Sequence, residues 1–184
     1  MGVVDVIKTA EGGRKFDVDV RTVWVDQVTP DSALSALVAR AVRTTDSLAN
    51  RVITDIALPL PRTGNQYPLG NLIADAFRNV LRTDVALVNN GGVRADVAAG
   101  RLTYGQLFTV MPFQNQAVTV TLTGKQLREV AEASITAGGP DAHVSGMRIT
   151  YDLSRPAGQR VREIRLANGK KPKDSGRYTL AVNS

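Results

Sequence analysis

The stretch Asp84-Val85-Ala86-Leu87-Val88-Asn89-Asn90-Gly91-Gly92-Val93-Arg94 decides the fold class and the position of the candidate site. Its apolar run predicts a short buried strand, and the paired glycines predict a tight loop directly after it. Backbone amides in such a loop, next to the guanidinium of Arg94, can form a cradle for an anion. The same pattern also fits a purely structural turn with Arg94 on the surface.

Around this strand, the spacing of apolar residues predicts a mixture of helices and strands. Helices are predicted from Pro30 onward, over 69–81, over a short segment after Thr103, and after Thr123, which opens a capping box with Gln126. Further strands are predicted over 3–7, 16–25, 117–122, 144–151, 160–166 and 178–182. Helices and strands are mixed and the end is rich in strands. The order therefore predicts an α+β fold with a mixed sheet and packed helices, not a doubly wound parallel sheet.

The first 29 residues differ from the rest in organisation. Their two strands are separated by the polar turn Glu11-Gly12-Gly13-Arg14, and Phe16, Val18 and Val20 alternate with charged residues, which predicts one buried face. This hairpin lacks partner strands in the remaining sequence, which suits a fragment of another domain. The helix over 30–52 has the length and position of a connection between two domains.

Composition excludes several kinds of chemistry. The chain has 184 residues, no cysteine and one histidine, His143. Disulfide scaffolds, cysteine-bound zinc, iron–sulfur clusters and a thiol nucleophile are therefore excluded, and no P-loop or nucleophile elbow is present. We expect His143 in a surface or helix-capping role. The residues themselves thus predict a binding site and no catalytic apparatus.

The formal net charge of +6 favours anionic partners, but the basic residues form no stripe, so we expect no binding to nucleic acid. No run approaches the ~20 apolar residues of a membrane-spanning helix, so we expect no membrane partner. Met1-Gly2-Val3-Val4-Asp5 lacks the basic and apolar regions of a signal peptide. We interpret Met1-Gly2 as a start placed inside a longer parent chain.

Phe113 is a second candidate for ligand contact. It lies in a predicted loop, between Pro112 and the amides Gln114 and Asn115, in a chain with few aromatic residues. A loop phenylalanine flanked by amides is typical of a platform on which a base stacks. A phenylalanine tucked into the core is the alternative.

Five motifs in this order resemble the C-terminal domain of the 5'-nucleotidase family, which includes bacterial UDP-sugar hydrolases and 2',3'-cyclic-nucleotide phosphodiesterases. The resemblance runs from about residue 30 to residue 182. The motifs are Leu69-Gly70-Asn71-Leu72-Ile73-Ala74-Asp75-Ala76, Asn89-Asn90-Gly91-Gly92-Val93-Arg94, Leu102-Thr103-Tyr104-Gly105, Met111-Pro112-Phe113-Gln114-Asn115 and Ser145-Gly146-Met147-Arg148-Ile149-Thr150-Tyr151-Asp152.

The resemblance implies roles for six residues in binding a nucleotide. Asn89 and Arg94 match residues that contact the phosphate or ribose side, and Phe113 matches one aromatic ring of a pair that encloses the base. Asn115 matches an amide beside the base, and Gly146 matches a glycine on a strand that lines the pocket. Arg62 matches an arginine before the Leu-Gly-Asn helix.

The resemblance also implies a domain organisation. Residues 1–29 are expected to be the trailing strands of a preceding catalytic domain, 30–52 a connecting helix, and 53–184 a nucleotide-recognition domain. In the family a later segment supplies the second aromatic ring and a ribose-binding carboxylate, and this chain ends before it. We therefore expect weak nucleotide binding.

For function, the resemblance implies a parent protein that is a metal-dependent phosphoric ester hydrolase acting on nucleotides, in the periplasm or outside the cell. Its two divalent metals, such as zinc or manganese, are expected in an N-terminal metallophosphoesterase domain. That domain would be the partner of this chain, which itself would hold no cofactor and be inactive alone. The alternative is a non-catalytic binding or adhesion module that retains the fold.

Overall fold

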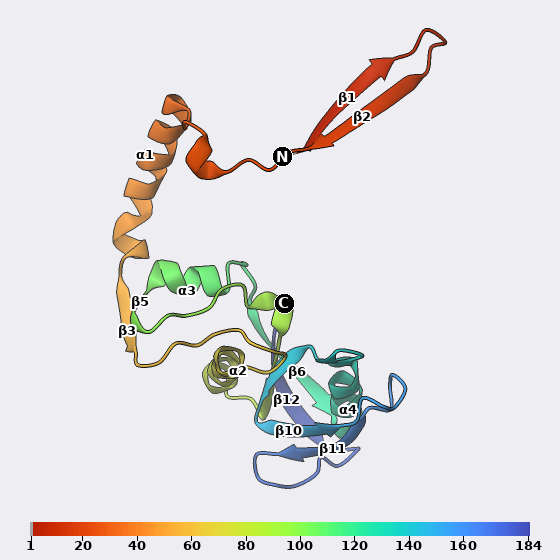
Figure 1. Cartoon of the computed structure of the whole chain (residues 1–184). Coiled ribbons are helices and arrows are strands. Elements are labelled where there is room, and N and C mark those ends of the chain that lie inside the picture. Colours follow the sequence, from red (N-terminus) through yellow and green to blue (C-terminus); the bar gives the residue numbers. More distant parts are fainter. Residues whose placement is uncertain (1) are drawn as a thin grey trace. The chain divides into compact units, whose positions relative to one another are not determined.

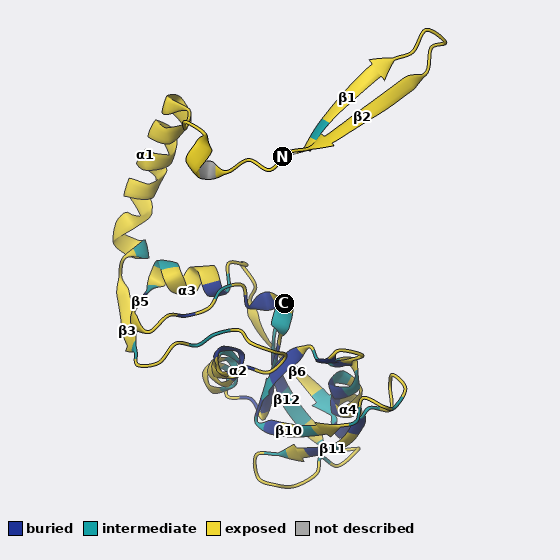
Figure 2. Cartoon of the chain, viewed as in Figure 1, coloured by how far each residue is buried: buried dark blue, intermediate teal, exposed yellow. Residues whose placement is uncertain are grey.

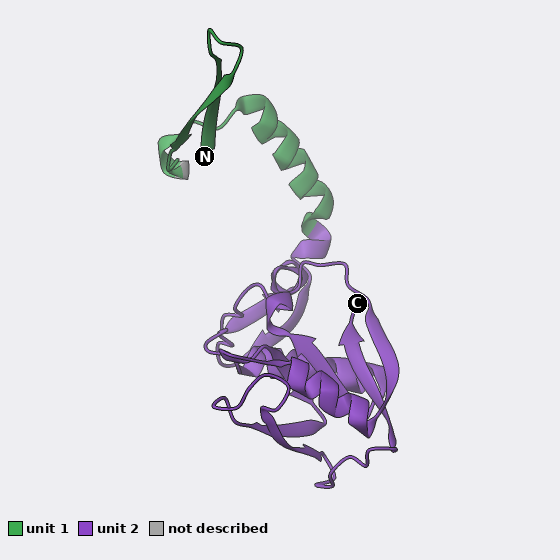
Figure 3. Ribbon diagram, turned by 90° about the vertical axis from the view of Figure 1, so that its right-hand side faces the viewer, with its two compact units in different colours: residues 1–46 green, residues 47–184 purple. Residues whose placement is uncertain are grey.

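The computed structural model describes residues 2–184, without the side chain of Val25. Met1, the first residue of the predicted segment 1–29, lies outside this description. The chain divides into two compact units between Asp46 and Ser47 (Figure 3). This division falls inside the helix α1 (Ser32–Ala49), which corresponds to the helix predicted over 30–52.

The first unit contains an antiparallel hairpin of β1 (Gly2–Lys8) and β2 (Arg14–Val20), then the short 3-10 helix η1 (Val25–Gln27). The predicted hairpin is confirmed, although its second strand ends at Val20 and not at residue 25. The prediction of a buried face is wrong within this chain. Every residue of β2 is exposed (Figure 2), with Phe16 at 61% and Val20 at 80%.

The second unit is built around a four-stranded sheet (Figure 1). Strand β12 pairs in parallel with β4 and antiparallel with β6, and β9 pairs antiparallel with β4. This mixture of pairings, combined with packed helices, confirms the α+β fold with a mixed sheet. In sheet order the strands are β6 (Ala117–Thr123), β12 (Arg177–Asn183), β4 (Val85–Asn89) and β9 (Ala142–Ser145).

Different elements cover the two faces of this sheet. The helix α2 (Pro68–Leu81) packs on one face, where the small side chains of Ala74, Ala86 and Ala181 are fully buried. Small residues at this contact allow the helix axis to approach the strands closely. The helix α4 (Gly124–Ala133) and the hairpin of β10 (Met147–Tyr151) and β11 (Val161–Leu166) share a core with the other face. That core consists of Val85, Leu127, Ala131, Ile135, Met147, Val161, Ile164 and Leu180.

A second apolar cluster lies under the loops that follow β4. It joins residues from the loop before α2, from the chain after the glycine loop, and from the helix α3 (Tyr104–Val110). Its buried members are Tyr67, Leu69, Val93, Val97, Leu102 and Val110. The strands β3 (Val52–Ile56) and β5 (Gly100–Thr103), which the sequence analysis did not predict, pair with each other beside this cluster.

Local sequence signals explain several element boundaries. Thr103 and Thr123 each form a complete capping box, which confirms both predicted helix starts. The strand predicted over 144–151 is divided at Gly146 into β9 and β10, which belong to different sheets. Short elements complete the unit: η2 (Asn90–Gly92), β7 (Ile135–Thr136) and β8 (Gly139–Pro140). Among residues 2–184, none of the helices is both long enough and apolar enough to pass through a lipid bilayer.

Candidate functional site

The glycine loop lies at the carboxyl end of β4, beside the carboxyl end of its parallel neighbour β12. Asn89 ends β4, and its Oδ1 accepts a hydrogen bond of 3.3 Å from Nδ2 of Asn183, the last residue of β12. The chain then turns through η2 so tightly that a Cβ atom on Gly92 would lie 2.9 Å from Oδ1 of Asn89. The loop therefore presents the Asn89 amide at the strand ends, where open α/β sheets commonly bind ligands.

Arg94 follows this loop and is attached to the end of α3. Its backbone amide donates to the carbonyl oxygen of Val110 at 2.7 Å, and its Nη1 donates to the carbonyl oxygen of Gly91 at 3.3 Å. The rest of the guanidinium is exposed to solvent. An exposed guanidinium with free N–H groups can bind a phosphate or a carboxylate in a bidentate manner, through two parallel hydrogen bonds.

Phe113 lies in the loop that begins where α3 ends, next to Val110. Its ring is 49% exposed, so it is not part of the core. Asn115 follows in the same loop and is also exposed. The loop is anchored to the end of the chain, because the backbone of Gln116 donates to Oγ of Ser184 at 3.0 Å and accepts from its backbone amide at 2.9 Å.

Arg62 is bonded to the glycine loop after β4 and to the residues that follow it. Its Nη1 donates to the carbonyl oxygen of Val93 at 2.5 Å, and its backbone amide donates to Oδ1 of Asp96 at 2.9 Å. The Asp96 carboxylate also lies 3.5 Å from Nε of Arg62 and offsets part of its charge. Close by, burial raises the pKa of Tyr67; Arg62 opposes this shift and Asp96 adds to it. Hydrogen bonds thus connect the segments that carry five predicted site residues: Asn89, Arg94, Phe113, Asn115 and Arg62.

Gly146 lies apart from this group. In the register of β4 and β9, Ala142 faces Asn89 whereas Ser145 faces Ala86, so Gly146 follows at the other end of β4. Its φ of +74° is a conformation that favours glycine, and a Cβ atom there would collide with the carbonyl oxygen of Asp84. These observations explain why the position is a glycine.

The structure brings a different glycine segment, residues 138–141, to the Asn89 loop. The backbone amide of Asn90 donates to the carbonyl oxygen of Asp141 at 3.0 Å, and its Nδ2 donates to those of Asn65 at 3.1 Å and Pro140 at 3.3 Å. Nδ2 of Asn65 in turn donates to the carbonyl oxygen of Gly138 at 2.5 Å. Oδ1 of Asn90 is buried and has no partner within the described residues. The clustering of asparagine and glycine was the only signal for this part of the site.

Comparison with known proteins identifies this arrangement. Residues 26–184 match the family model described as "5'-nucleotidase, C-terminal domain". The chain belongs to this family.

Relatives of this 5'-nucleotidase C-terminal domain are nucleotide-processing proteins much longer than the chain. Endonuclease YhcR from Bacillus subtilis is 34% identical over 192 residues, which cover 100% of this chain and 15% of the relative. The trifunctional nucleotide phosphoesterase protein YfkN from the same organism is 34% identical over 71% of this chain and 10% of its own length. The 5'-nucleotidase precursor from Thermus thermophilus superposes with a TM-score of 0.72 at 28% identity, over 99% of this chain and 39% of that one.

His143 occupies a different place in this 5'-nucleotidase C-terminal domain from the one expected. A surface or capping role is wrong, because the side chain is fully buried between the sheet and α2. Its ring lies edge-on to Tyr67 at 4.2 Å between centroids, directly beneath Gly70. Nδ1 lies 3.0 Å from Oδ1 of Asn71, and Nε2 has no partner in the described chain. Burial lowers the pKa of His143, so the ring is neutral at pH 7.

No group of three or more His, Cys, Asp or Glu side chains in residues 2–184 is placed to hold a metal ion. The residues of this 5'-nucleotidase C-terminal domain therefore do not fit a two-metal centre, and we assign no chemical step through a metal to them.

Proposed function

We propose that this chain recognises the nucleotide substrate of a longer, metal-dependent phosphoesterase. The convergence of Arg94, Arg62 and Phe113 around the loop at the end of β4 carries this proposal. Two guanidiniums offset by one carboxylate favour an anionic group, and an exposed ring in a neighbouring loop provides an apolar face. A nucleotide combines these two chemical features.

Each residue has a distinct task in this proposal. Arg94 binds the phosphate or the ribose side with the N–H groups that its bond to Gly91 leaves free. Phe113 stacks against the base, and Asn115 offers its amide to the edge of that base. Asn89, held by Asn183, directs its Nδ2 toward the ligand while Arg62 keeps Val93 and the loop in place.

Bond cleavage is assigned to another part of the longer protein. The chain spans 15% of the first relative and 39% of the Thermus thermophilus structure, which leaves ample length for a catalytic domain with two divalent metals. The hairpin of the first unit supports this division, because Val4, Val6, Phe16, Val18 and Val20 form an exposed apolar face that needs covering. The description of one relative as a precursor supports a periplasmic or extracellular location.

The test is a titration of the 184-residue chain with AMP and with adenosine, followed by NMR chemical shifts. We expect weak, saturable AMP binding that shifts residues of the 89–94 and 113–115 loops. Arg94→Gln should weaken AMP binding about tenfold, since charge-assisted hydrogen bonds contribute about 1.5–3 kcal/mol. Loss of adenosine binding as well would place Arg94 at the ribose, and unchanged adenosine binding would place it at the phosphate. Arg177→Gln, an exposed arginine at the far end of β12, is the matched control.

Two results would reject the proposal. One is the absence of AMP binding up to about 10 mM, which would favour a binding or adhesion module that has kept only the fold. The other is AMP binding that Arg94→Gln leaves unchanged. Phosphate release from AMP by the pure chain would contradict the assignment of catalysis to another domain.

A further inference from the structure

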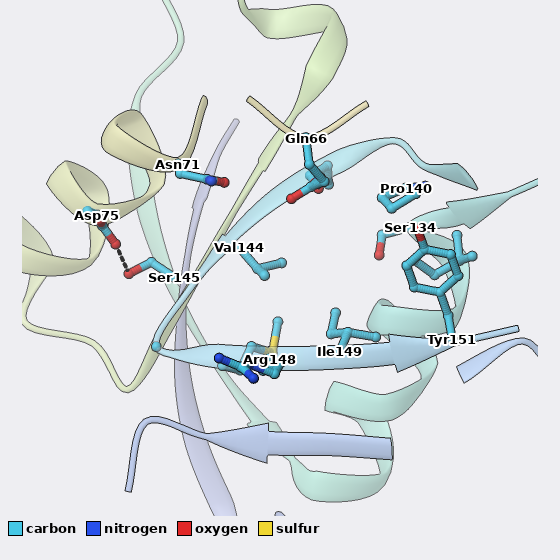
Figure 4. Close-up of a pocket in the computed structure, with 14 residues that line it drawn as sticks. Gln66, Asn71, Asp75, Ser134, Pro140, Val144, Ser145, Arg148, Ile149 and Tyr151 are labelled. Carbon is cyan, nitrogen blue, oxygen red and sulfur yellow. Dashed lines mark hydrogen bonds between the residues drawn. The ribbon is translucent and has the colours of Figure 1, made fainter. Parts of the chain in front are cut away.

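A separate hollow opens where β9 and β10 diverge at Gly146 (Figure 4). β9 is bonded to β4 and β10 to β11, so the two strands belong to different sheets and leave a wedge between them. The wedge has a volume of about 470 Å³, within the range of sites that bind small molecules. An adjoining hollow of about 440 Å³ shares part of its wall, namely Asp75, Ser145, Gly146, Met147 and Arg148.

Polar groups at one end of the wedge are held in fixed positions. Oγ of the buried Ser145 donates to Oδ1 of Asp75 at 2.5 Å. The side-chain amide of Asn71 lies 3.0 Å from Nδ1 of the buried His143 and also lines the wedge. Such pre-positioned polar groups reduce the entropy lost when a ligand binds.

The two hollows differ in charge. One cation, Arg148, and one anion, Asp75, line the wedge, whereas two further arginines line the adjoining hollow. Arg148 lines both hollows, and within residues 2–184 its guanidinium makes no hydrogen bond or ion pair. Arg78 and Arg165 line the adjoining hollow, while Asp75 is the one carboxylate among the described residues of either wall. Arg165 is paired with Glu163 at 2.8 Å, and Nε of Arg78 donates to the carbonyl oxygen of Asp84 at 3.0 Å. Arg148 is therefore the arginine of these walls whose guanidinium has no protein partner among the described residues.

The other end of the wedge is apolar. Ile149, Tyr151 and Pro140 line it together with Ser134, and along β10 the side chains run from Arg148 through Ile149 to Tyr151 (Figure 4). A ligand that reaches both ends therefore meets a cation at one end and an aromatic ring at the other.

We propose that this wedge binds a small organic anion whose phosphate or carboxylate group contacts Arg148 and whose apolar body lies against Ile149 and Tyr151. The polar end of the wedge, at Ser145 and Gly146, lies at the end of β4 opposite Asn89, whereas Pro140 and Ala142 extend its wall toward the Asn89 loop. Anion binding in the wedge does not depend on the proposed function.

The experiment is an NMR titration of the chain with phenyl phosphate, benzoate and inorganic phosphate. Phenyl phosphate or benzoate should shift residues 71, 145 and 148–151 and saturate, and the tighter of the two identifies the preferred head group. Inorganic phosphate, which lacks the apolar body, should bind about tenfold more weakly. Arg148→Gln should weaken the organic anion about tenfold. Arg101→Gln, an exposed arginine on β5 that lines neither hollow, should have no effect.

The Arg94→Gln variant separates this proposal from the nucleotide site. Phenyl phosphate or benzoate must still bind in the wedge of the Arg94→Gln variant, even if that variant no longer binds AMP. The proposal is overturned if neither organic anion shifts the wedge residues by about 10 mM. It is equally overturned if the shifts occur only at residues 89–94 and 113–115, or if Arg148→Gln binds as tightly as Arg101→Gln.

Discussion

The backbone amide of Arg94 donates to the carbonyl oxygen of Val110 at 2.7 Å, and this bond joins the glycine loop after β4 to the end of α3. The guanidinium of Arg94 and the ring of Phe113 are therefore carried by two segments that are fixed to each other at their bases. The relationship makes the contribution of Phe113 to ligand binding directly testable.

Phe113→Ala should weaken adenosine binding about tenfold, because stacking on one aromatic face contributes about 1–3 kcal/mol per base. Phe108→Ala is a well-matched control, since Phe108 is 50% exposed, close to the 49% of Phe113, and lies on α3. Titration calorimetry or NMR provides the measurement. If Phe113→Ala and Phe108→Ala lose adenosine affinity equally, Phe113 does not contact the base.

Gly70→Ala should destabilise the second unit, although glycine-to-alanine changes inside helices normally stabilise by about 1 kcal/mol. The added Cβ would collide with the ring of His143, whose buried position leaves no room to move. We expect a loss of about 1–3 kcal/mol in the free energy of unfolding, measured with urea. In a His143→Ala background, Gly70→Ala should lower the free energy of unfolding much less. An equally large decrease in that background would refute the steric explanation.

The stability of the second unit should fall as the pH drops below about 6.5. The pKa of His143 is lowered by burial, so the unfolded chain binds a proton in a pH range where the folded chain does not. Unfolding therefore becomes easier as pH falls below the unfolded pKa, and the loss levels off below the folded pKa. His143 is the one histidine of the chain, so His143→Gln should remove this dependence between about pH 7.5 and 5.5.

The acidic groups with shifted pKa values titrate outside that window. Hydrogen bonds from Lys171 and then Arg165 lower the pKa of Glu163, and the hydrogen bonds from Ser154 lower that of Asp152. The stability that these carboxylates contribute is lost only at more acidic pH. A stability profile of His143→Gln parallel to that of the unchanged chain would disprove the role of the histidine.

Gly146→Ala should lower the free energy of unfolding by at least about 2 kcal/mol more than Gly169→Ala does. Both glycines have a positive φ, +74° and +78°, so both substitutions carry the same backbone strain. At Gly169 the new Cβ has open space, whereas at Gly146 it meets the carbonyl oxygen of Asp84. Equal unfolding free energies for the two variants would show that β9 and β10 can shift to accommodate a side chain.

Much of the second unit follows from local sequence signals. The apolar run of β4, the helical stripe of α2 and the capping boxes at Thr103 and Thr123 each depend on neighbouring residues alone, and all are confirmed. The strands β3 and β5 were missed because each is short and is stabilised by pairing with a distant segment. The consecutive strands β11 and β12 do not pair with each other: β11 pairs with β10, and β12 pairs with β4 and β6.

The candidate site was predictable where one motif contains both the turn and the charged residue, as in the loop from Asn89 to Arg94. It was not predictable where contacts join distant segments. The buried place of His143 depends on Gly70 and Tyr67, which are far away in the sequence. Asn65 and Gly138 come together beside the Asn89 loop through a hydrogen bond between residues 73 positions apart in the sequence.

The pairing of Ser184 with Gln116 has a practical consequence for anyone who purifies this protein. Residues fused after Ser184 would leave the sheet next to Asn115 and within reach of the Asn183–Asn89 pair. A polyhistidine tag attached there would add imidazoles beside the proposed nucleotide site and compete with weak ligands. Affinity measurements should therefore use material from which any such carboxyl-terminal tag has been removed.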